Sequence, residues 1–462
     1  MVRPHKIVLA TLAVVLLAAG CSRGGENSEG RATDGGSAAA ATASGDFGDL
    51  KNICHSGKPT SAPAQGVTAG EIKLGVFTDV GFTKNPELVD AAKVFTGWCN
   101  DAGGVNGRRL VTDIHDAKLM EVRQRMLDAC RDDFALVGGG AALDGLAVKD
   151  RLSCLLPDFP AQPVQVTNIG SDLQAGYGTP TTPVATPNAG YYKWLATRYP
   201  GSGAAIGIIN GDSPMTKPIA EQYGEIFAAQ GDTVVYNDLY PAAGVTDWTP
   251  YAVSIKAKGV KGLIFLGDFH QLAKLEDVLT DMDYKLDWID ANSNAYSSSF
   301  LQLASHSIAA QHNYVNLAGV APLSAADTIP AVAQVKDLYK KYAPGADVTE
   351  PALHAFIAWA LFAKSASACG DAPTRKCVLD HALAETAWTG GGLQAPQDLS
   401  PSGKAATCYD VQVATAAGWQ AADFGPENGG VYRCDTPTLA LQHDYGKPLT
   451  LADVGKSSSD LK

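Results

Sequence analysis

The chain has 462 residues and a formal net charge of −12, with 46% hydrophobic and 18% charged residues. These proportions are ordinary for a globular protein, and the length is sufficient for two or three domains with a sizeable core. The acidic balance, without clusters of basic residues, argues against a partner rich in phosphates, so we expect no binding to nucleic acid.

The first 20 residues have the features of an export signal. Arg3 and Lys6 precede an uncharged apolar run at residues 7–19. This run is shorter than the roughly 20 apolar residues that span a bilayer. A basic start, a short apolar stretch and small residues before the cut predict a signal peptide over residues 1–20.

The residues at the expected cut, Leu-Ala-Ala-Gly-Cys at positions 17–21, resemble the lipobox of bacterial lipoproteins. This resemblance implies cleavage before Cys21 and attachment of acyl chains to it. The chains would anchor the protein to the outer face of the cell membrane, or on the periplasmic side in a two-membrane cell. The alternative is an ordinary secretory signal whose cleavage site includes a cysteine. Residues 21–48 are mostly Ser, Gly, Ala and Thr, with Phe47 the only aromatic. We therefore expect a flexible linker with a reach of roughly 30 Å.

Eight cysteines follow Cys21, and an even number in an exported chain predicts disulfides. No Cys-x-x-Cys pair or Cys/His cluster has zinc-ligand spacing, so we expect no metal site. The sequence favours the pairs Cys369–Cys377, Cys408–Cys434, Cys99–Cys130 and Cys54–Cys154. Other pairings and free buried thiols remain open.

Short β-rich runs alternate with helical patterns along the chain. Up to residue 152, strands are expected at 72–77, 110–114 and 134–137, and helices at 87–101, 120–129 and 143–152. A Pro- and Thr-rich segment at 179–188 interrupts this alternation. It resumes with helices at 190–198, 216–230, 248–258 and 272–282 and strands at 204–209, 233–237, 262–266 and 287–291. A strand-like run at 314–319 and helices at 329–342 and 351–367 follow.

This alternation predicts an α/β protein with two lobes, each built on a mostly parallel sheet. We assign residues 49–184 and 318–390 to lobe 1, and residues 185–317 and 391–445 to lobe 2. Residues 446–462 form a C-terminal tail.

Residues 71–137 resemble the N-terminal lobe of branched-chain amino-acid-type solute-binding proteins, which serve ABC importers. The resemblance rests on Ile-Lys-Leu-Gly-Val at 72–76, on the helix at 91–100, on Asp-Ala-Gly-Gly-Val-Asn-Gly-Arg at 101–108, and on the strand at 134–138. It implies a type I periplasmic-binding fold, with two Rossmann-like lobes joined by three crossover strands near Thr182, Leu317 and Gly390. It also implies a non-catalytic protein without a cofactor, which would act as a monomer and deliver a solute to a permease with its ATPase.

In open α/β sheets, ligands bind beyond the carboxyl ends of the strands. Candidate cleft residues therefore follow the predicted strands. In lobe 1 they are Asp79, Phe82, Thr83, Gly139, Ala141, Ala142, Leu143, Ala161 and Gln162; in lobe 2 they are Asp212, Met215, Phe269, Asn292, Ser293 and Tyr296.

The chain departs from the family pattern at two of these positions. Amino-acid binders carry a hydroxyl residue after the third strand for the solute carboxylate, where this chain has Ala141, Ala142 and Leu143. Asn292 stands where they carry a carboxylate for the ammonium group. Because burying an unpartnered zwitterion is costly, we expect a less polar solute.

Two other functions remain open: a binding protein for a signalling partner, and a secreted lipoprotein hydrolase. The hydrolase is disfavoured because the sequence has no nucleophile elbow, Walker phosphate loop or His-Glu-x-x-His motif. His270, beside Asp268, is the only histidine in an expected cleft loop.

Overall fold

The computed structural model describes residues 44–176, 188–403, 407–427, 430–435 and 439–462. The expected signal peptide, Cys21, most of the expected linker and Thr182 lie outside these residues. Among the residues described, no helix combines the length and the apolar character that crossing a bilayer would need.

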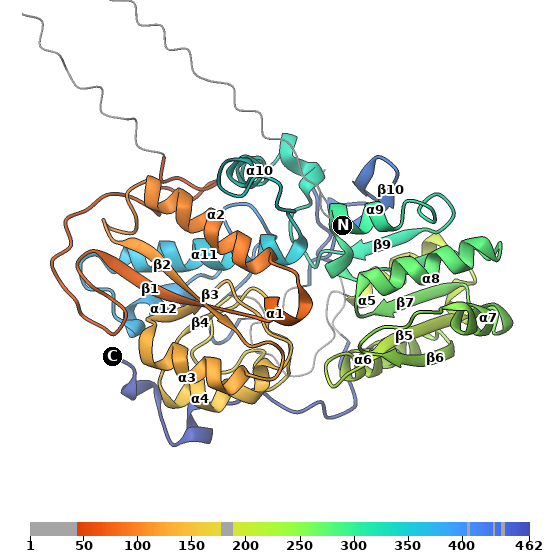
Figure 1. Ribbon diagram of the computed structural model, residues 1–462, viewed down its shortest axis with the longest axis horizontal. Helices are drawn as coiled ribbons and strands as arrows, with labels where there is room; N and C mark the ends of the chain where they lie inside the picture. The colour runs from red at the N-terminus through yellow and green to blue at the C-terminus, as the bar shows by residue number, and fades with distance from the viewer. Residues whose placement is uncertain (1–43, 177–187, 404–406, 428–429, 436–438) are drawn as a thin grey trace, which may run out of the picture. The chain divides into compact units, whose positions relative to one another are not determined.

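The described strands form two separate sheets (Figure 1). The first has the order β2-β1-β3-β4, and its strands are parallel. They are β1 (Glu71–Thr78), β2 (Arg109–Asp116), β3 (Ala135–Val137) and β4 (Asp158–Phe159). The second half of β1 is buried throughout, as expected for a parallel strand with both faces covered.

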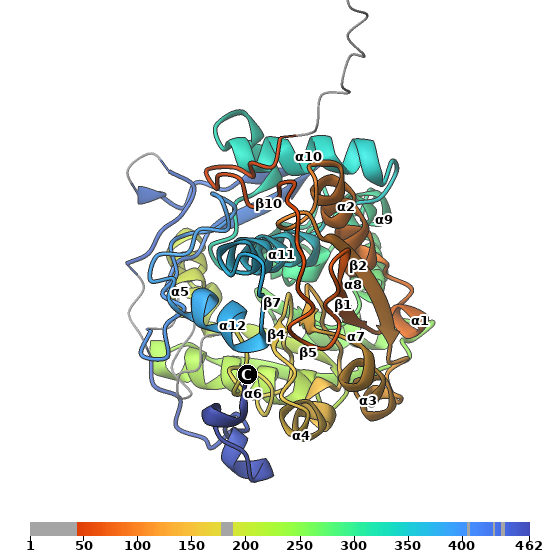
Figure 2. The ribbon, with the colours of Figure 1, turned by 90° about the vertical axis from the view of Figure 1, so that its left-hand side faces the viewer.

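Helices from two parts of the chain surround the first sheet, and together they form lobe 1. They are α1 (Val80–Thr83), α2 (Glu87–Asp101), α3 (Val122–Asp132), the 3-10 helix η1 (Asp144–Ala147), α4 (Val148–Ser153), α10 (Pro330–Tyr342), α11 (Glu350–Ala368) and α12 (Arg375–Leu383). α11 contacts α2, α12, β3 and β4 (Figures 1 and 2). Almost all of its residues are buried, because it is apolar on every side and forms the centre of the lobe.

The second sheet and its helices form lobe 2. The strand order is β11-β10-β9-β8-β7-β5-β6, and only the pairs β9–β10 and β10–β11 are antiparallel among the described strands. The strands are β5 (Ile206–Asp212), β6 (Val234–Pro241), β7 (Gly262–Leu266), β8 (Trp288–Asp290), β9 (Asn313–Asn316), β10 (Val411–Thr415) and β11 (Gly418–Ala421). The helices are α5 (Asn188–Arg198), α6 (Thr216–Gln230), α7 (Thr249–Ala257), α8 (Phe269–Asp281) and α9 (Ser298–Leu303). The short 3-10 helices η2 (Ser202–Ala204) and η3 (Ser293–Ala295) also belong to this lobe. Three others are η4 (Leu323–Asp327), which contacts α10, η6 (Leu451–Val454), which contacts α4, and η7 (Ser458–Asp460).

The chain leaves lobe 2 after β9, beside Leu317, and returns to it at β10. The outgoing and returning segments pair with each other: the backbone N–H of Ala321 donates to the Leu393 carbonyl (2.7 Å), and that of Ala395 donates to the Gly319 carbonyl (2.8 Å). Two connections between the lobes are therefore bonded side by side.

The Gly-rich turn after α2 explains why that helix stops. Gly103, Gly104 and Gly107 all have left-handed φ values, which glycine adopts without steric cost. A Cβ on Gly104 would lie 2.1 Å from the Arg108 carbonyl oxygen. The string that carries the family resemblance is thus a tight turn that leads directly into β2.

The expected linker is shorter than the sequence suggested, because residues 44–48 belong to the folded body. Phe47 is fully buried, and its ring packs against Phe95, Trp98 and Phe356. The indole N–H of Trp98 donates to the Ser44 carbonyl (3.0 Å). A single aromatic residue after a polar tract can anchor the chain, and composition alone does not reveal this.

Two of the four expected disulfides are wrong. The structure pairs Cys54 with Cys99 and Cys130 with Cys154, instead of Cys99 with Cys130 and Cys54 with Cys154. The segment at Cys54 lies on the end of α2, where the N–H of His55 donates to the Gly104 carbonyl (2.6 Å). The expected pairs Cys369–Cys377 and Cys408–Cys434 are confirmed.

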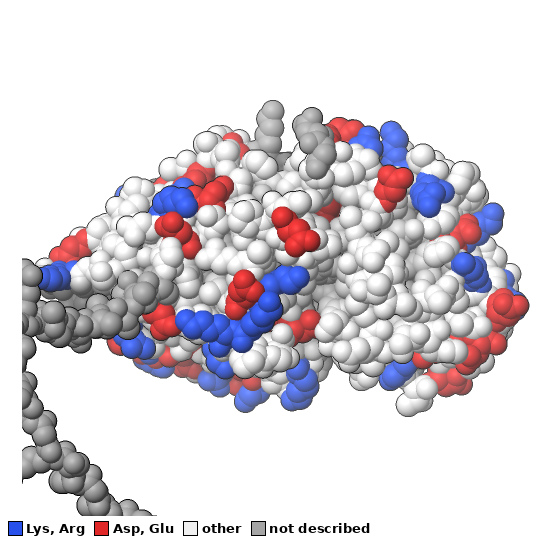
Figure 3. All heavy atoms as spheres, turned by 90° about the horizontal axis from the view of Figure 1, so that it is seen from above, with Lys and Arg blue, Asp and Glu red and all other residues white. Residues whose placement is uncertain are grey.

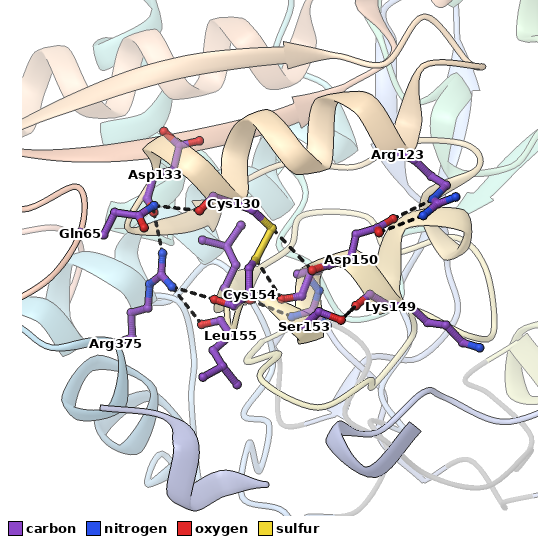
Figure 4. Close-up of a disulfide and its surroundings, with 12 residues drawn as sticks. Gln65, Arg123, Cys130, Asp133, Lys149, Asp150, Ser153, Cys154, Leu155 and Arg375 are labelled. Carbon is purple, nitrogen blue, oxygen red and sulfur yellow. Dashed lines mark hydrogen bonds and ion pairs between the residues drawn. A yellow bond between two sulfur atoms is a disulfide. The ribbon is translucent and has the colours of Figure 1, made fainter. Parts of the chain in front are cut away.

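The Cys130–Cys154 disulfide joins α3 to the end of α4 (Figure 4). Arg375 lies beside it and donates to the backbone carbonyls of Asp133 (2.8 Å) and Cys154 (3.0 Å). The disulfide therefore sits at a junction of α3, α4 and α12.

Basic and acidic side chains are interspersed on the face shown in Figure 3. Exposed ion pairs include Lys341–Asp101 (3.2 Å) and Lys340–Asp337 (2.9 Å). Pairs of this kind contribute little to stability, since solvent screens both partners.

Candidate functional site

Three loops of lobe 1 meet where the strands β1, β3 and β4 end. The N–H of Gly140 donates to the Phe77 carbonyl (2.8 Å), and the N–H groups of Ala161 and Gln162 donate to the Gly139 carbonyl (2.8 and 3.2 Å). The structure therefore brings together the candidates after β3 and after β4. Parallel strands end at one edge of a sheet, which is why residues far apart in sequence converge here.

Asp79 fixes this edge of the sheet. Its Oδ1 accepts a hydrogen bond from the Leu119 N–H (2.6 Å) and its Oδ2 accepts one from the Ala142 N–H (2.7 Å). Only 5% of the residue is exposed. Both carboxylate oxygens thus hold protein backbone, in the loop after β2 and in the loop after β3.

The glycine run at 138–140 is needed for packing. A Cβ on Gly139 would lie 2.7 Å from the backbone N and O of Phe77, and one on Gly138 would lie 2.3 Å from the Trp359 indole nitrogen. The run lets the loop after β3 lie directly against β1 and α11.

Exposed apolar side chains lie beside Asp79. Phe82, in α1, is 55% exposed, and Met120, in the loop after β2, is 75% exposed. Within that loop, Lys118 and Leu119 have left-handed φ values of 44° and 69°. Such values cost energy for non-glycine residues and often mark functional segments. Thr83 is exposed, and its hydroxyl donates to the Asp79 carbonyl (3.2 Å).

One lobe 2 candidate contacts the lobe 1 candidates. Met215, in the loop after β5, packs against the apolar cluster that contains Phe77, Ala141 and Leu143. Asp212, in the same loop, is exposed and pairs with Lys217 (2.5 Å). The loops after β3 and β5 therefore face each other through an apolar contact.

The loop after β7 opens with a capped helix. Asp268 caps α8 by accepting from the His270 N–H (2.9 Å), and the same oxygen, Oδ1, lies 2.7 Å from His270 Nδ1. The Phe269 ring stacks on the His270 ring at 4.4 Å and is almost buried. His270 is thus part of a local cap.

The loop after β8 is held by a buried carboxyl group. Asn292 has a left-handed φ of 64°, and its N–H donates to Asp290 Oδ1 (3.0 Å). Asp290 Oδ2 accepts from the Tyr192 hydroxyl (2.5 Å). Burial raises the pKa of Asp290 to about 6, and the hydrogen bond from Tyr192 opposes this rise. Ser293 begins η3 in this loop.

Tyr296 lies in the protein interior, unlike the expected cleft side chain. It is buried, its hydroxyl accepts from the Leu323 N–H (2.9 Å), and its ring lies 5.4 Å from that of Trp419. Tyr296 therefore supports the segment that leaves lobe 2.

Sequence reasoning missed the groups that hold the loop after β4. Asp144, in η1, accepts from the N–H groups of Val164 (2.7 Å) and Gln165 (2.9 Å). Burial raises the pKa of Asp144 to about 6. Arg151 is buried beside it and donates to the Leu156 carbonyl (3.1 Å). The sequence offered one signal for this role: a charged residue on the inner side of the short helix expected at residues 143–152.

A cavity of about 20 Å³ lies behind these loops, lined in part by Gly139, Ala141, Asp144, Arg151 and Gln162. This volume has room for about one water molecule. A second cavity, of about 10 Å³, is bordered by Pro160, His354 and Trp388. Neither of these two cavities has room for a molecule much larger than water.

Asp113, His115 and Asp133 lie close enough together to hold a metal ion. Some of their polar atoms are already paired: His115 Nε2 lies 2.5 Å from Asp133 Oδ2, and Lys73 lies 2.7 Å from Asp113. The expectation of no metal site remains a prediction.

Residues 71–419 match the family model of the periplasmic binding proteins, so the chain belongs to this family of non-catalytic solute-binding proteins. A comparison with curated proteins gives no match.

Solved structures share the fold. A fatty acid ABC transporter substrate-binding protein from Thermomonospora curvata is 17% identical with a TM-score of 0.66, covering 82% of this chain and 95% of that one. The leucine-binding protein LivK from Thermotoga maritima is 12% identical with a TM-score of 0.62, covering 76% and 97%. The branched-chain amino acid binding protein LivJ from Streptococcus pneumoniae, solved with isoleucine, is 15% identical with a TM-score of 0.60, covering 76% and 98%. The expected family and the type I periplasmic-binding fold are confirmed.

Proposed function

We propose that this protein is the solute-binding lipoprotein of an ABC importer. It is exported, anchored through acyl chains on Cys21, and captures a small solute between its two lobes for delivery to a permease. Membership of the periplasmic binding protein family supports the solute and the transporter as partners. The solute is less polar than a standard branched-chain amino acid.

The observation that carries this proposal is the Asp79–Ala142 hydrogen bond. By the family resemblance, the loop after the third strand receives the solute carboxylate. In this chain the N–H of Ala142 is occupied by Asp79 Oδ2 at 2.7 Å. The protein's own carboxylate therefore fills the place that an amino acid would need.

The electrostatic cost of a second carboxylate at this position is substantial. Two like charges about 4 Å apart repel by about 4 kcal/mol at an effective dielectric constant of about 20. This energy corresponds to a factor of about 10³ in Kd. A zwitterionic solute in the family orientation is thus strongly disfavoured.

The side chains around Asp79 favour an apolar solute. Phe82 is 55% exposed and Met215 is partly exposed, so both offer apolar surface of the kind that lines small-molecule sites; Leu143 and Phe269, which are almost buried, would add to it if the loops parted. The name of the Thermomonospora curvata protein gives a fatty acid as its solute. An apolar chain is therefore compatible with this fold.

The test is calorimetry on purified residues 44–462, with leucine compared against neutral medium-chain alcohols. Mass spectrometry of any small molecule that co-purifies would identify the natural solute. We expect a neutral amphiphile to bind at least about 100-fold more tightly than leucine. Leucine binding with a Kd near 1 μM would overturn the proposed solute class.

The lipid anchor needs a separate test. Full-length protein from the native membrane should carry acyl groups on a peptide that begins at Cys21, seen by mass spectrometry. A Cys21→Ala variant should be released from the membrane fraction. A peptide that begins elsewhere, or that carries no acyl group, would contradict the anchor.

A further inference from the structure

The C-terminal segment, residues 439–462, contacts both lobes; we call it the strap. Its first part lies on lobe 2. The carboxylate of Glu225, on α6, accepts hydrogen bonds from the N–H groups of Gln442 and His443 (2.5 and 3.1 Å) and from the Tyr445 hydroxyl (2.7 Å). Leu439 and Leu441 pack against the apolar core of lobe 2.

The second part of the strap lies on lobe 1. The N–H of Leu449 donates to the Thr167 carbonyl (3.0 Å), and the Leu449 carbonyl accepts from the Asp172 N–H (3.1 Å). The N–H of Leu451 donates to Asp172 Oδ2 (2.6 Å). Leu451 and Leu461 are buried, and η6 contacts α4. Figure 1 shows this end of the chain, in deep blue, below α4.

The two attachments are separated by very little chain. Four residues lead from Tyr445 to Leu449, and at about 3.5 Å per residue they extend to about 14 Å. Gly446 turns the chain with a φ of 89°, and Pro448 stiffens it, so the usable length is smaller. While both attachments hold, α6 and the Thr167–Asp172 loop cannot separate beyond this length.

The lobe 1 attachment is part of a loop that concerns the candidate site. The segment from Pro160 to Gly176 follows β4 and includes Ala161 and Gln162 as well as Thr167 and Asp172. The strap thereby connects α6 of lobe 2 to a candidate solute loop of lobe 1.

We propose that the strap is a further tether between the lobes, beside the crossover segments, and that it limits how far the solute cleft opens. This inference rests on the proposed capture of solute between two lobes that part and close. A short tether of this kind permits hinge motion up to its length and resists motion beyond it. On lobe 2 the attachment consists of hydrogen bonds to one surface carboxylate, that of Glu225, and of packing by the partly buried Leu439 and Leu441, whereas the lobe 1 end buries Leu451 and Leu461.

The experiment measures the distance between the lobes without any solute. Labels are placed at exposed Lys93 on α2 and Lys274 on α8, through a ketone-bearing amino acid that leaves the native disulfides intact. Single-molecule energy transfer gives the distance distribution. Glu225→Ala removes the hydrogen bonds of the lobe 2 attachment, and truncation after Tyr445 removes the lobe 1 attachment. Glu221→Ala, one turn earlier on α6, is the matched control.

We expect Glu225→Ala and the truncation to move the distribution to longer and broader distances, with Glu221→Ala matching the unmodified protein. Unchanged distributions in Glu225→Ala and the truncated chain would overturn the tether. If truncation unfolds the body, Glu225→Ala decides alone, since it leaves every lobe 1 contact in place. Because no solute is present, a negative result here leaves the proposed solute unaffected, and failure to bind any solute leaves this result unaffected.

Discussion

The strongest prediction concerns Asp79, because its carboxylate holds two separate loops. Replacing Asp79 with Ala removes the acceptors for the Leu119 and Ala142 N–H groups, which lie 2.6 and 2.7 Å away. A backbone donor left without its partner costs about 1–3 kcal/mol. Both donors belong to partly exposed residues, so water can replace part of the lost bonding. We therefore expect a loss of about 2–4 kcal/mol in the free energy of unfolding.

The assay is urea unfolding followed by tryptophan fluorescence and circular dichroism. Asp79→Ala should lower the midpoint without changing the slope, since the surface exposed on unfolding stays the same. Asp79→Asn keeps one acceptor and should lose about half as much. Asp212→Asn is the control: this exposed carboxylate pairs with the exposed Lys217, so its effect should stay within about 0.5 kcal/mol. Equal stabilities for Asp79→Ala and Asp212→Asn would refute the reasoning.

The same variant tests the solute argument. Removing the carboxylate frees the Ala142 N–H and removes the repulsion of about 4 kcal/mol. Asp79→Ala should therefore bind leucine more tightly than the unmodified protein does, as measured by calorimetry. The opposite order, with leucine bound by the unmodified protein and lost in the variant, would mean that Asp79 contacts the ammonium group of the solute directly.

Three further substitutions test interactions that stabilise the folded protein. Burial raises the pKa of Glu276 from 4.5 to about 8. Its contribution to stability is therefore greatest below pH 4.5 and decreases as the pH rises to 8. In urea titrations between pH 5 and 9, Glu276→Gln should lose up to about 5 kcal/mol less stability with rising pH than the unmodified protein does. Replacing Cys130 and Cys154 with Ser removes a disulfide between residues 24 positions apart. The free energy of unfolding should fall by about 3 kcal/mol, measured from the shift in urea midpoint. Phe47→Ala removes a fully buried ring and should lower the free energy of unfolding by about 3–5 kcal/mol in the same assay. A change below about 1 kcal/mol would contradict the inclusion of residues 44–48 in the folded body.

Local patterns in the sequence were sufficient to predict the class of fold. The alternation of short apolar runs with helical periods predicted two α/β lobes, because the hydrophobic period of an element is set by its own backbone geometry. The turn at 103–108 carried the family resemblance, since its glycines are required by left-handed φ values. Placing the candidate loops after the strands likewise needed only chain order, and the loops after β3 and β4 do meet.

The roles of single residues could not be predicted in this way. Nothing near Asp79 in sequence indicates that its partners are Leu119 and Ala142. The same holds for Tyr296, which stood after a strand but is buried against Trp419.

The sequence by itself determined the class of fold and the candidate loops in which a solute site is proposed, because each depends on short stretches of chain; the export signal that it predicts lies outside the described residues. Only the tertiary structure decided which cysteines pair, that Phe47 belongs to the body, and that the residues after Tyr445 return from lobe 2 to lobe 1. These features depend on contacts between segments that are distant in sequence. The packing of the whole chain creates such contacts, and no local period records them.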